Sequence, residues 1–124
     1  MPTHLSIVSE HRGGIEILLM SGEIDLSTAP LVSEALAGAL TAGAALVADL
    51  TGVEFLDSAG ARALVVADAA LAERGGRMLT VPSPAVRRVV DLGGLDSVLH
   101  LHASVSDALD AGRLFADSRR ERGD

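Results

Sequence analysis

One serine in this chain stands where a phosphate could be attached and recognised by another molecule. Ser58 follows Asp57 at the start of a helix expected over residues 58–73, and an apolar strand expected over residues 46–50 leads to it. A helix start has unpaired N–H groups and the positive end of the helix dipole, so it accommodates a phosphate. The carboxylate of Asp57 would repel that phosphate. One modification would therefore change the surface charge sharply while the helix persists, which is the physical basis of a switch.

Two other interpretations of this serine stay open at the level of the residues. Asp57 or Ser58 can simply be the N-cap of the helix, a common role for both residue types. Ser58 could also be a nucleophile, but Leu56-Asp-Ser-Ala-Gly60 lacks the first glycine of the Gly-x-Ser-x-Gly turn. No histidine lies in a loop that obviously approaches it. A small serine hydrolase is therefore only a remote alternative.

Two other kinds of site are considered in the sequence: a metal site at a pair of histidines and a phosphate-binding loop. His100 and His102 share one face of a strand expected over residues 98–102, and such a pair can ligate a metal. The sequence offers no third ligand at a suitable spacing, so two ordinary strand residues are the better interpretation. There is also no Walker loop and no Gly-x-Gly-x-x-Gly segment to hold a nucleotide phosphate. We expect no metal and no cofactor.

The composition limits the classes of partner. The 124 residues allow one domain, and 48% hydrophobic with 22% charged residues is typical of a globular protein. The net charge of −7 opposes binding to nucleic acid or to an anionic membrane surface. The chain has no cysteine, which excludes thiol chemistry and disulfides. No signal peptide and no apolar run long enough to span a membrane are evident, so we expect a cytoplasmic protein.

The elements that must position Ser58 alternate between strands and helices. The first two strands should form a hairpin around Gly13-Gly14, and Ser104 should begin a last helix that buries Ala108, Leu109 and either Leu114 or Phe115. This order predicts an α/β fold with a mixed sheet of about five strands and about four helices packed largely on one face. The domain should span residues 1–116, followed by a disordered tail over 117–124. Strands are expected over 5–8, 14–20, 46–50, 77–81 and 98–102, and helices over 28–41, 58–73, 84–92 and from 104 onward.

The helix over residues 58–73 carries more apolar surface than one contact with a sheet requires. One stripe can lie on the sheet, and Val65 and Val66 lie outside it. Such a helix is either deeply buried or meets a partner. The pattern alone does not decide between a binding surface and an alanine-rich packing bias.

Three segments of the chain resemble one known family. Asp49-Leu-Thr-Gly-Val-Glu-Phe-Leu-Asp-Ser-Ala-Gly60 is similar to the signature of STAS domains, and specifically of the bacterial anti-sigma factor antagonists. Gly22-Glu-Ile-Asp-Leu-Ser-Thr-Ala-Pro30 resembles the loop that enters the first helix of that family, and residues 82–95 resemble its third helix. The resemblance covers about residues 4 to 115. It implies the STAS-type fold, in which the sheet is mostly parallel.

The resemblance also implies a function and a set of site residues. The unphosphorylated form would bind an anti-sigma factor with serine kinase activity and release a sigma factor, and phosphorylation of Ser58 by that partner would switch binding off. A phosphoserine phosphatase would restore the hydroxyl, and the chain itself would be no enzyme. A STAS subunit of a larger signalling or transporter-associated assembly is the alternative. We expect a monomer, with a weak dimer as the other option. The expected partner-binding residues are Asp25, Ser27, Thr28, Asp57, Ser58, Ala59, Gly60, Arg62 and Val65.

Overall fold

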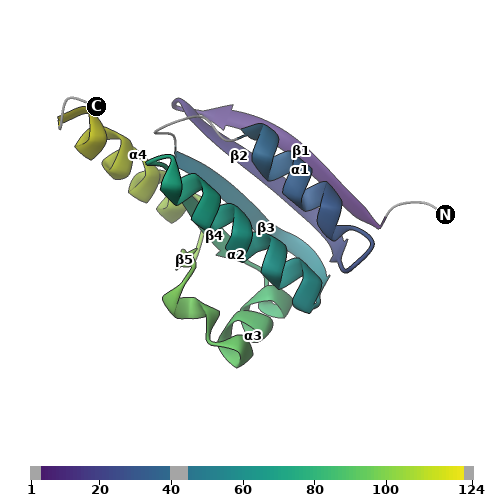
Figure 1. The fold of residues 1–124 in the computed structure, drawn as a ribbon. Coiled ribbons are helices and arrows are strands. Elements are labelled where there is room, and N and C mark those ends of the chain that lie inside the picture. The colour runs from purple at the N-terminus through teal and green to yellow at the C-terminus, as the bar shows by residue number, and fades with distance from the viewer. Residues whose placement is uncertain (1–3, 40–44, 122–124) are drawn as a thin grey trace.

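The protein is a five-stranded mixed sheet covered by four helices (Figure 1). The structure is a computed structural model that describes residues 4–39 and 45–121. The strands lie in the order β1-β2-β3-β4-β5; β1 and β2 are antiparallel, and the other neighbours are parallel. This confirms the predicted mixed and mostly parallel α/β sheet. The elements are β1 (Leu5–Arg12), β2 (Ile15–Ile24), α1 (Ala29–Ala39), β3 (Ala45–Leu56), α2 (Ser58–Glu73), β4 (Arg77–Pro82), α3 (Pro84–Gly93), a 3₁₀ turn η1 (Leu95–Ser97), β5 (His100–Leu101) and α4 (Val105–Glu121).

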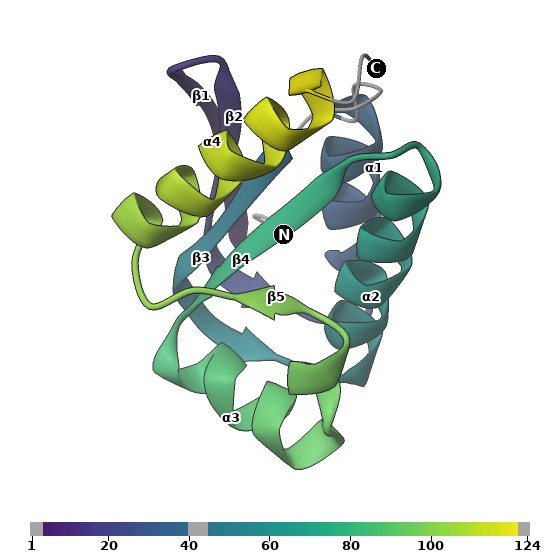
Figure 2. The ribbon, with the colours of Figure 1, turned by 90° about the vertical axis from the view of Figure 1, so that its left-hand side faces the viewer.

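The sheet separates two apolar clusters of different size. The larger cluster joins β2, β3 and β4 to α1, α2 and α3, with Leu36, Leu64 and Val90 fully buried. The smaller cluster joins the opposite face of the same strands to α4, through Ala108 and Leu109. Figure 2 shows α4 on one side of the sheet and α1 with α2 on the other. Among the described helices, α1, α2 and α3 therefore contribute to one core, and α4 covers the second face.

The hairpin between β1 and β2 is formed as the sequence predicts. Gly13 and Gly14 both have positive φ angles, 57° and 80°, which suit a two-residue hairpin turn. Arg12 pairs directly with Ile15 across the turn. Both strands are longer than expected, because residues 9–12 and 21–24 continue the ladder. β3 likewise extends past the predicted residues 46–50 to Leu56.

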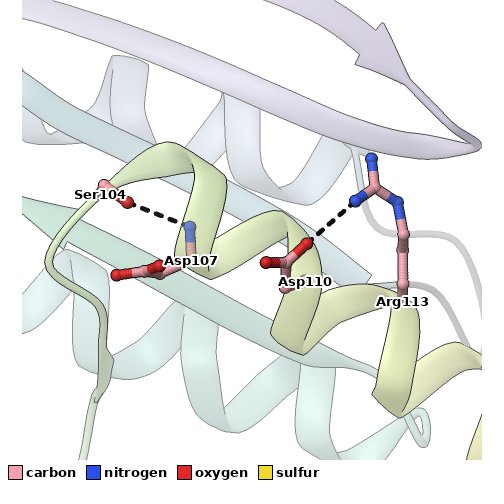
Figure 3. A network of polar contacts seen from close by, with 4 residues as sticks. All are labelled: Ser104, Asp107, Asp110 and Arg113. Atoms are coloured by element: carbon pink, nitrogen blue, oxygen red, sulfur yellow. Dashed lines mark hydrogen bonds and ion pairs between the residues drawn. The ribbon is translucent and has the colours of Figure 1, made fainter.

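Helix α4 begins as predicted but ends later. The hydroxyl of Ser104 accepts a hydrogen bond from the N–H of Asp107 at 3.0 Å, and Arg113 donates to Asp110 one turn further on (Figure 3). Phe115 packs against the smaller cluster and Leu114 is 72% exposed, so the predicted alternative of Leu114 or Phe115 is met by Phe115. Residues 117–121 continue the helix, which corrects the predicted disordered tail. Residues 122–124 lie outside the described residues.

The last strand differs most from expectation. β5 comprises only His100 and Leu101, whereas a strand over residues 98–102 was predicted. Val98 has helical backbone angles and ends η1. The predicted helix over residues 28–41 is present as α1, and its last two residues fall among those that are not described. None of the described helices combines the length and the apolar character needed to cross a membrane.

Candidate functional site

The junction between β3 and α2 assigns different roles to Asp57 and Ser58. Asp57 is the N-cap of α2: its backbone is extended, and its Oδ1 accepts a hydrogen bond from the N–H of Gly60 at 3.0 Å. Ser58 is the first helical residue, and its side chain is exposed. Among the residues that the structure describes, the Ser58 hydroxyl has no hydrogen-bond partner. The capping interpretation therefore applies to Asp57 alone and leaves the Ser58 hydroxyl accessible.

The loop after β2 lies directly beside this junction. β2 and β3 are parallel, with Ile24 opposite Leu56, so both strands end at the same edge of the sheet. The N–H of Asp57 donates a hydrogen bond to the carbonyl of Ile24 at 3.1 Å. Asp25 follows Ile24 in the chain and therefore starts its loop next to Asp57. The two loops that carry the predicted site residues are thus brought together.

Hydrogen bonds within the first loop hold it in one shape. Oδ1 of Asp25 accepts from the Ser27 hydroxyl at 2.8 Å and from the N–H groups of Ser27 and Thr28. These bonds lower the pKa of Asp25, with the Ser27 hydroxyl as the largest cause. In return the Thr28 hydroxyl accepts from the N–H of Asp25 at 2.9 Å and donates to the carbonyl of Glu23. Asp25 and Thr28 therefore order the loop in the way that a reciprocal helix cap does.

Gly60 is required by packing within the chain itself. A side-chain carbon at this position would lie 2.6 Å from Cγ2 of Ile24 and from Cδ1 of Leu56, and 2.9 Å from the Ile24 carbonyl oxygen. Gly60 is buried. The small residue allows the first turn of α2 to lie against the end of β2, and a contact of Gly60 with a partner stays a prediction.

A shallow hollow of about 550 Å³ lies between α1 and the first turns of α2. Two apolar side chains stand at its surface: Leu26 is 77% exposed and Val66 is 56% exposed. Ala59, the residue after Ser58, forms part of the wall, so the hollow begins beside the serine. The remaining lining residues include Ala29, Pro30, Ser33, Glu34, Arg62 and Ala63.

The hollow contains some of the predicted partner-binding residues and adds others. Ala59 and Arg62 line it. Val65 is half-buried and packs against the larger apolar cluster, whereas its neighbour Val66 faces outward. Sequence reasoning did not select Leu26 or Val66 as site residues. The signal for Val66 was its place outside the core stripe of α2; Leu26, in a loop, gave no periodic signal.

The histidine pair does not form part of a cluster of ligands. His100 is exposed on β5, and His102 follows that strand beside the start of α3. Within residues 4–39 and 45–121, no group of three or more histidine, aspartate or glutamate side chains is arranged to hold a metal ion.

Comparison with known proteins defines the family. The sequence model of the STAS domain family matches residues 6–108 of this chain. An anti-sigma-F factor antagonist of Mycobacterium tuberculosis, RsfB, is 31% identical over 109 residues, which are 87% of this chain and 89% of that protein. The crystal structure of an anti-sigma factor antagonist from Mycobacterium paratuberculosis has a TM-score of 0.80 and 36% identity, with 88% of this chain and 94% of the other covered.

A third comparison shows the fold alone. The phosphorylated form of the Bacillus cell fate determinant SpoIIAA has a TM-score of 0.64 at 21% identity, with 86% of this chain and 98% of the other covered. The sheet and its helices thus have the fold of a STAS domain. The chain belongs to the STAS domain family, and within it to the anti-sigma factor antagonists.

Proposed function

We propose that the unphosphorylated chain binds an anti-sigma factor with serine kinase activity and so releases a sigma factor. Phosphorylation of Ser58 by that partner then weakens the complex, and a phosphatase restores it. The chain is the regulated substrate of the kinase and contributes no catalytic group. The observation that carries the proposal is the exposed Ser58 hydroxyl. It is not used to cap α2, because Asp57 is the N-cap.

The hollow beside Ser58 supports a direct contact with the partner. The small residues that line it and the exposed Leu26 and Val66 provide apolar surface that a partner could cover. Because Ala59 forms part of its wall, a partner segment seated in the hollow would lie close to the hydroxyl. A phosphate on Ser58 would then have to be desolvated at the edge of the interface.

The local charges explain how one phosphate could weaken the complex. Asp57 adjoins the modified residue and would repel the phosphate. Arg62 lies four residues further along α2, on the same face as Ser58, where it could pair with a phosphate at position 58. Such a pair would withdraw Arg62 from the hollow that it lines. A 100-fold weakening needs only about 2.7 kcal/mol, which these two effects together can supply.

The test is phosphorylation in the presence of the cognate kinase and ATP. Intact-mass analysis should show one added phosphate, and fragmentation should locate it on Ser58. Ser97→Ala, a change of an exposed serine in η1 that belongs to neither loop, should leave the reaction intact, whereas Ser58→Ala should abolish it. Modification of Ser27, Thr28 or Thr51 with Ser58 untouched would refute the assignment.

A further inference from the structure

A second site, distinct from the loops around Ser58, lies at the opposite end of the sheet. It is a groove of about 420 Å³ between the start of β4 and the second half of α4. Arg77, the first residue of β4, pairs with Ala45, the first residue of β3. β3 is twelve residues long, and Ser58 follows its other end, two residues after Leu56. The groove and the loops around Ser58 are therefore separated by the full length of β3.

Two arginines in this groove make contacts other than ion pairs. The guanidinium of Arg77 lies over the ring of Phe115, 4.6 Å from its centroid, and Phe115 is one of only two aromatic residues in the chain. The guanidinium of Arg119 lies against Gly75, where a side-chain carbon would come within 2.7 Å of Nη1 of the arginine. Gly75 has a φ of 79°, so the turn at this position favours glycine.

Neither guanidinium is neutralised by a carboxylate within the described part of the chain. The ion pairs formed there by arginines use Arg12, Arg87, Arg113 and Arg120. The charge of Arg77 acts on Asp68 of α2 and lowers its pKa, although burial raises that pKa by more, and the two side chains form no ion pair. Other described arginines also lack an ion pair, but Arg77 and Arg119 line the same groove. In a protein with a net charge of −7, two guanidinium groups without an ion pair in one groove make it a candidate site for an anion.

The remaining lining defines the shape of that ligand. Guanidinium groups bind the oxygens of phosphates in a bidentate manner, and the Ser118 hydroxyl adds a further donor at the groove. Ala111 and Leu114 supply an apolar wall, and Leu114 is 72% exposed. We propose that this groove binds a small organic phosphate, with the phosphate between Arg77 and Arg119 and the organic part on Leu114.

Phenyl phosphate, titrated into ¹⁵N-labelled protein at constant ionic strength, tests the proposal. Saturable shifts are expected at the amides of Gly75, Arg77 and Ser118. Arg119→Gln and Arg77→Gln should each weaken binding by about tenfold or more, as expected for loss of charge-assisted hydrogen bonds. Arg88→Gln is the matched control, because Arg88 is an exposed arginine of α3 outside the groove; it should change the dissociation constant by less than about twofold.

A second variant guards against loss of the fold. Ser118→Glu keeps both arginines and places a carboxylate where the phosphate should lie, so it should abolish binding without lowering the melting temperature. Ser58→Ala should bind phenyl phosphate like the wild type, which separates this site from the proposed function. Unsaturable shifts, shifts centred on α3 or on the loops around Ser58, or an equal loss in Arg88→Gln would overturn the proposal.

Discussion

At the scale of residues, the arrangement around Ser58 depends on which of two neighbours caps α2. The sequence places Asp57 and Ser58 together at the helix start, and either residue type can be an N-cap. The choice is made by the backbone: Asp57 is extended and reaches the N–H of Gly60, while Ser58 already has helical geometry. Sequence reasoning could therefore identify the pair but could not assign the two roles, because the assignment depends on one backbone angle.

Substitutions at Ser58 should change partner affinity and leave the fold intact. Ser58→Asp should melt within a few degrees of wild type, since changes at such surface positions usually cost less than about 0.5 kcal/mol. It should bind the anti-sigma partner more weakly than wild type but better than the phosphoprotein, because phosphate adds about −1.5 to −2 charges where aspartate adds one. Ser58→Ala should stay bound and resist phosphorylation. Calorimetry against the partner, alongside thermal melts, measures both effects; equal affinity in all forms would contradict the switch.

Thr80 allows a test of how much an unsatisfied buried hydroxyl lowers the free energy of unfolding. Its side chain is fully buried in β4, and within the described residues its hydroxyl has no hydrogen-bond partner. Thr80→Val should therefore raise the free energy of unfolding by about 1 kcal/mol or more, since an unsatisfied buried hydroxyl costs about 1–3 kcal/mol. Urea denaturation measures this change.

The matched control for that variant is Thr28→Val. Thr28 is also buried, but its hydroxyl is hydrogen-bonded to the carbonyl of Glu23 and to the N–H of Asp25. Here the same chemical change should lower the free energy of unfolding by about 1 kcal/mol. If both variants shifted stability in the same direction, the state of the Thr80 hydroxyl would not be the cause.

At the scale of elements, α2 was the easiest to predict and β5 the hardest. The bounds of α2 agree with the expected residues 58–73, because a sharp start signal and the Gly75-Gly76 stop enclose a long apolar stripe. β5 has only two residues, and its two ladder partners, Leu79 and Thr80, are set by the path of the chain after η1. The sequence around His100 carried too short a pattern to define such a strand.

The contact of α2 with β2 can be tested at Gly60. Gly60→Ala should destabilise the protein, because the added carbon would clash with Ile24 and Leu56 at 2.6 Å. Overpacking typically costs about 1–3 kcal/mol, which exceeds the gain of about 1 kcal/mol in helix propensity. Gly38→Ala in α1 is the control, since nothing lies within 4 Å of the added carbon, and it should stabilise the protein slightly. A stabilising Gly60→Ala, measured by urea denaturation, would contradict the packing argument.

At the scale of the whole molecule, the alternation of strands and helices predicts a mixed sheet, and the resemblance to STAS domains adds the expectation that it is mostly parallel. The position of α4 is less accessible from sequence. Its apolar residues, Ala108 and Leu109 among them, can pack on either face of the sheet, and the face is decided by the room that α1, α2 and α3 leave. The groove between α4 and β4 exists because α4 lies on this face. The sequence therefore could not predict that Arg77 and Arg119 line one groove.

The dependence of stability on pH should reveal the cost of burying one carboxylate, that of Asp68, in its charged form. Burial raises the pKa of Asp68, and the charges of His100 and Arg77 lower it by less. A raised folded-state pKa means that the folded protein holds this proton more tightly than the unfolded chain. The contribution of Asp68 is thus favourable at acid pH and is lost as the pH rises through its folded-state pKa.

Asp68→Asn should accordingly raise the melting temperature at pH 7, and the difference from wild type should shrink as the pH falls toward about 4, the ordinary range for aspartate. For Asp25 the change of stability with pH has the opposite sign. Its pKa is lowered by the Ser27 hydroxyl and the neighbouring N–H groups, so its favourable contribution is present above the ordinary value and is lost in acid. Asp25→Asn should therefore lower the melting temperature at pH 7 and have less effect in acid. Thermal melts of the two variants from pH 4 to pH 7 should diverge from wild type in opposite directions, and a common direction would show that burial of Asp68 is not what sets its pKa.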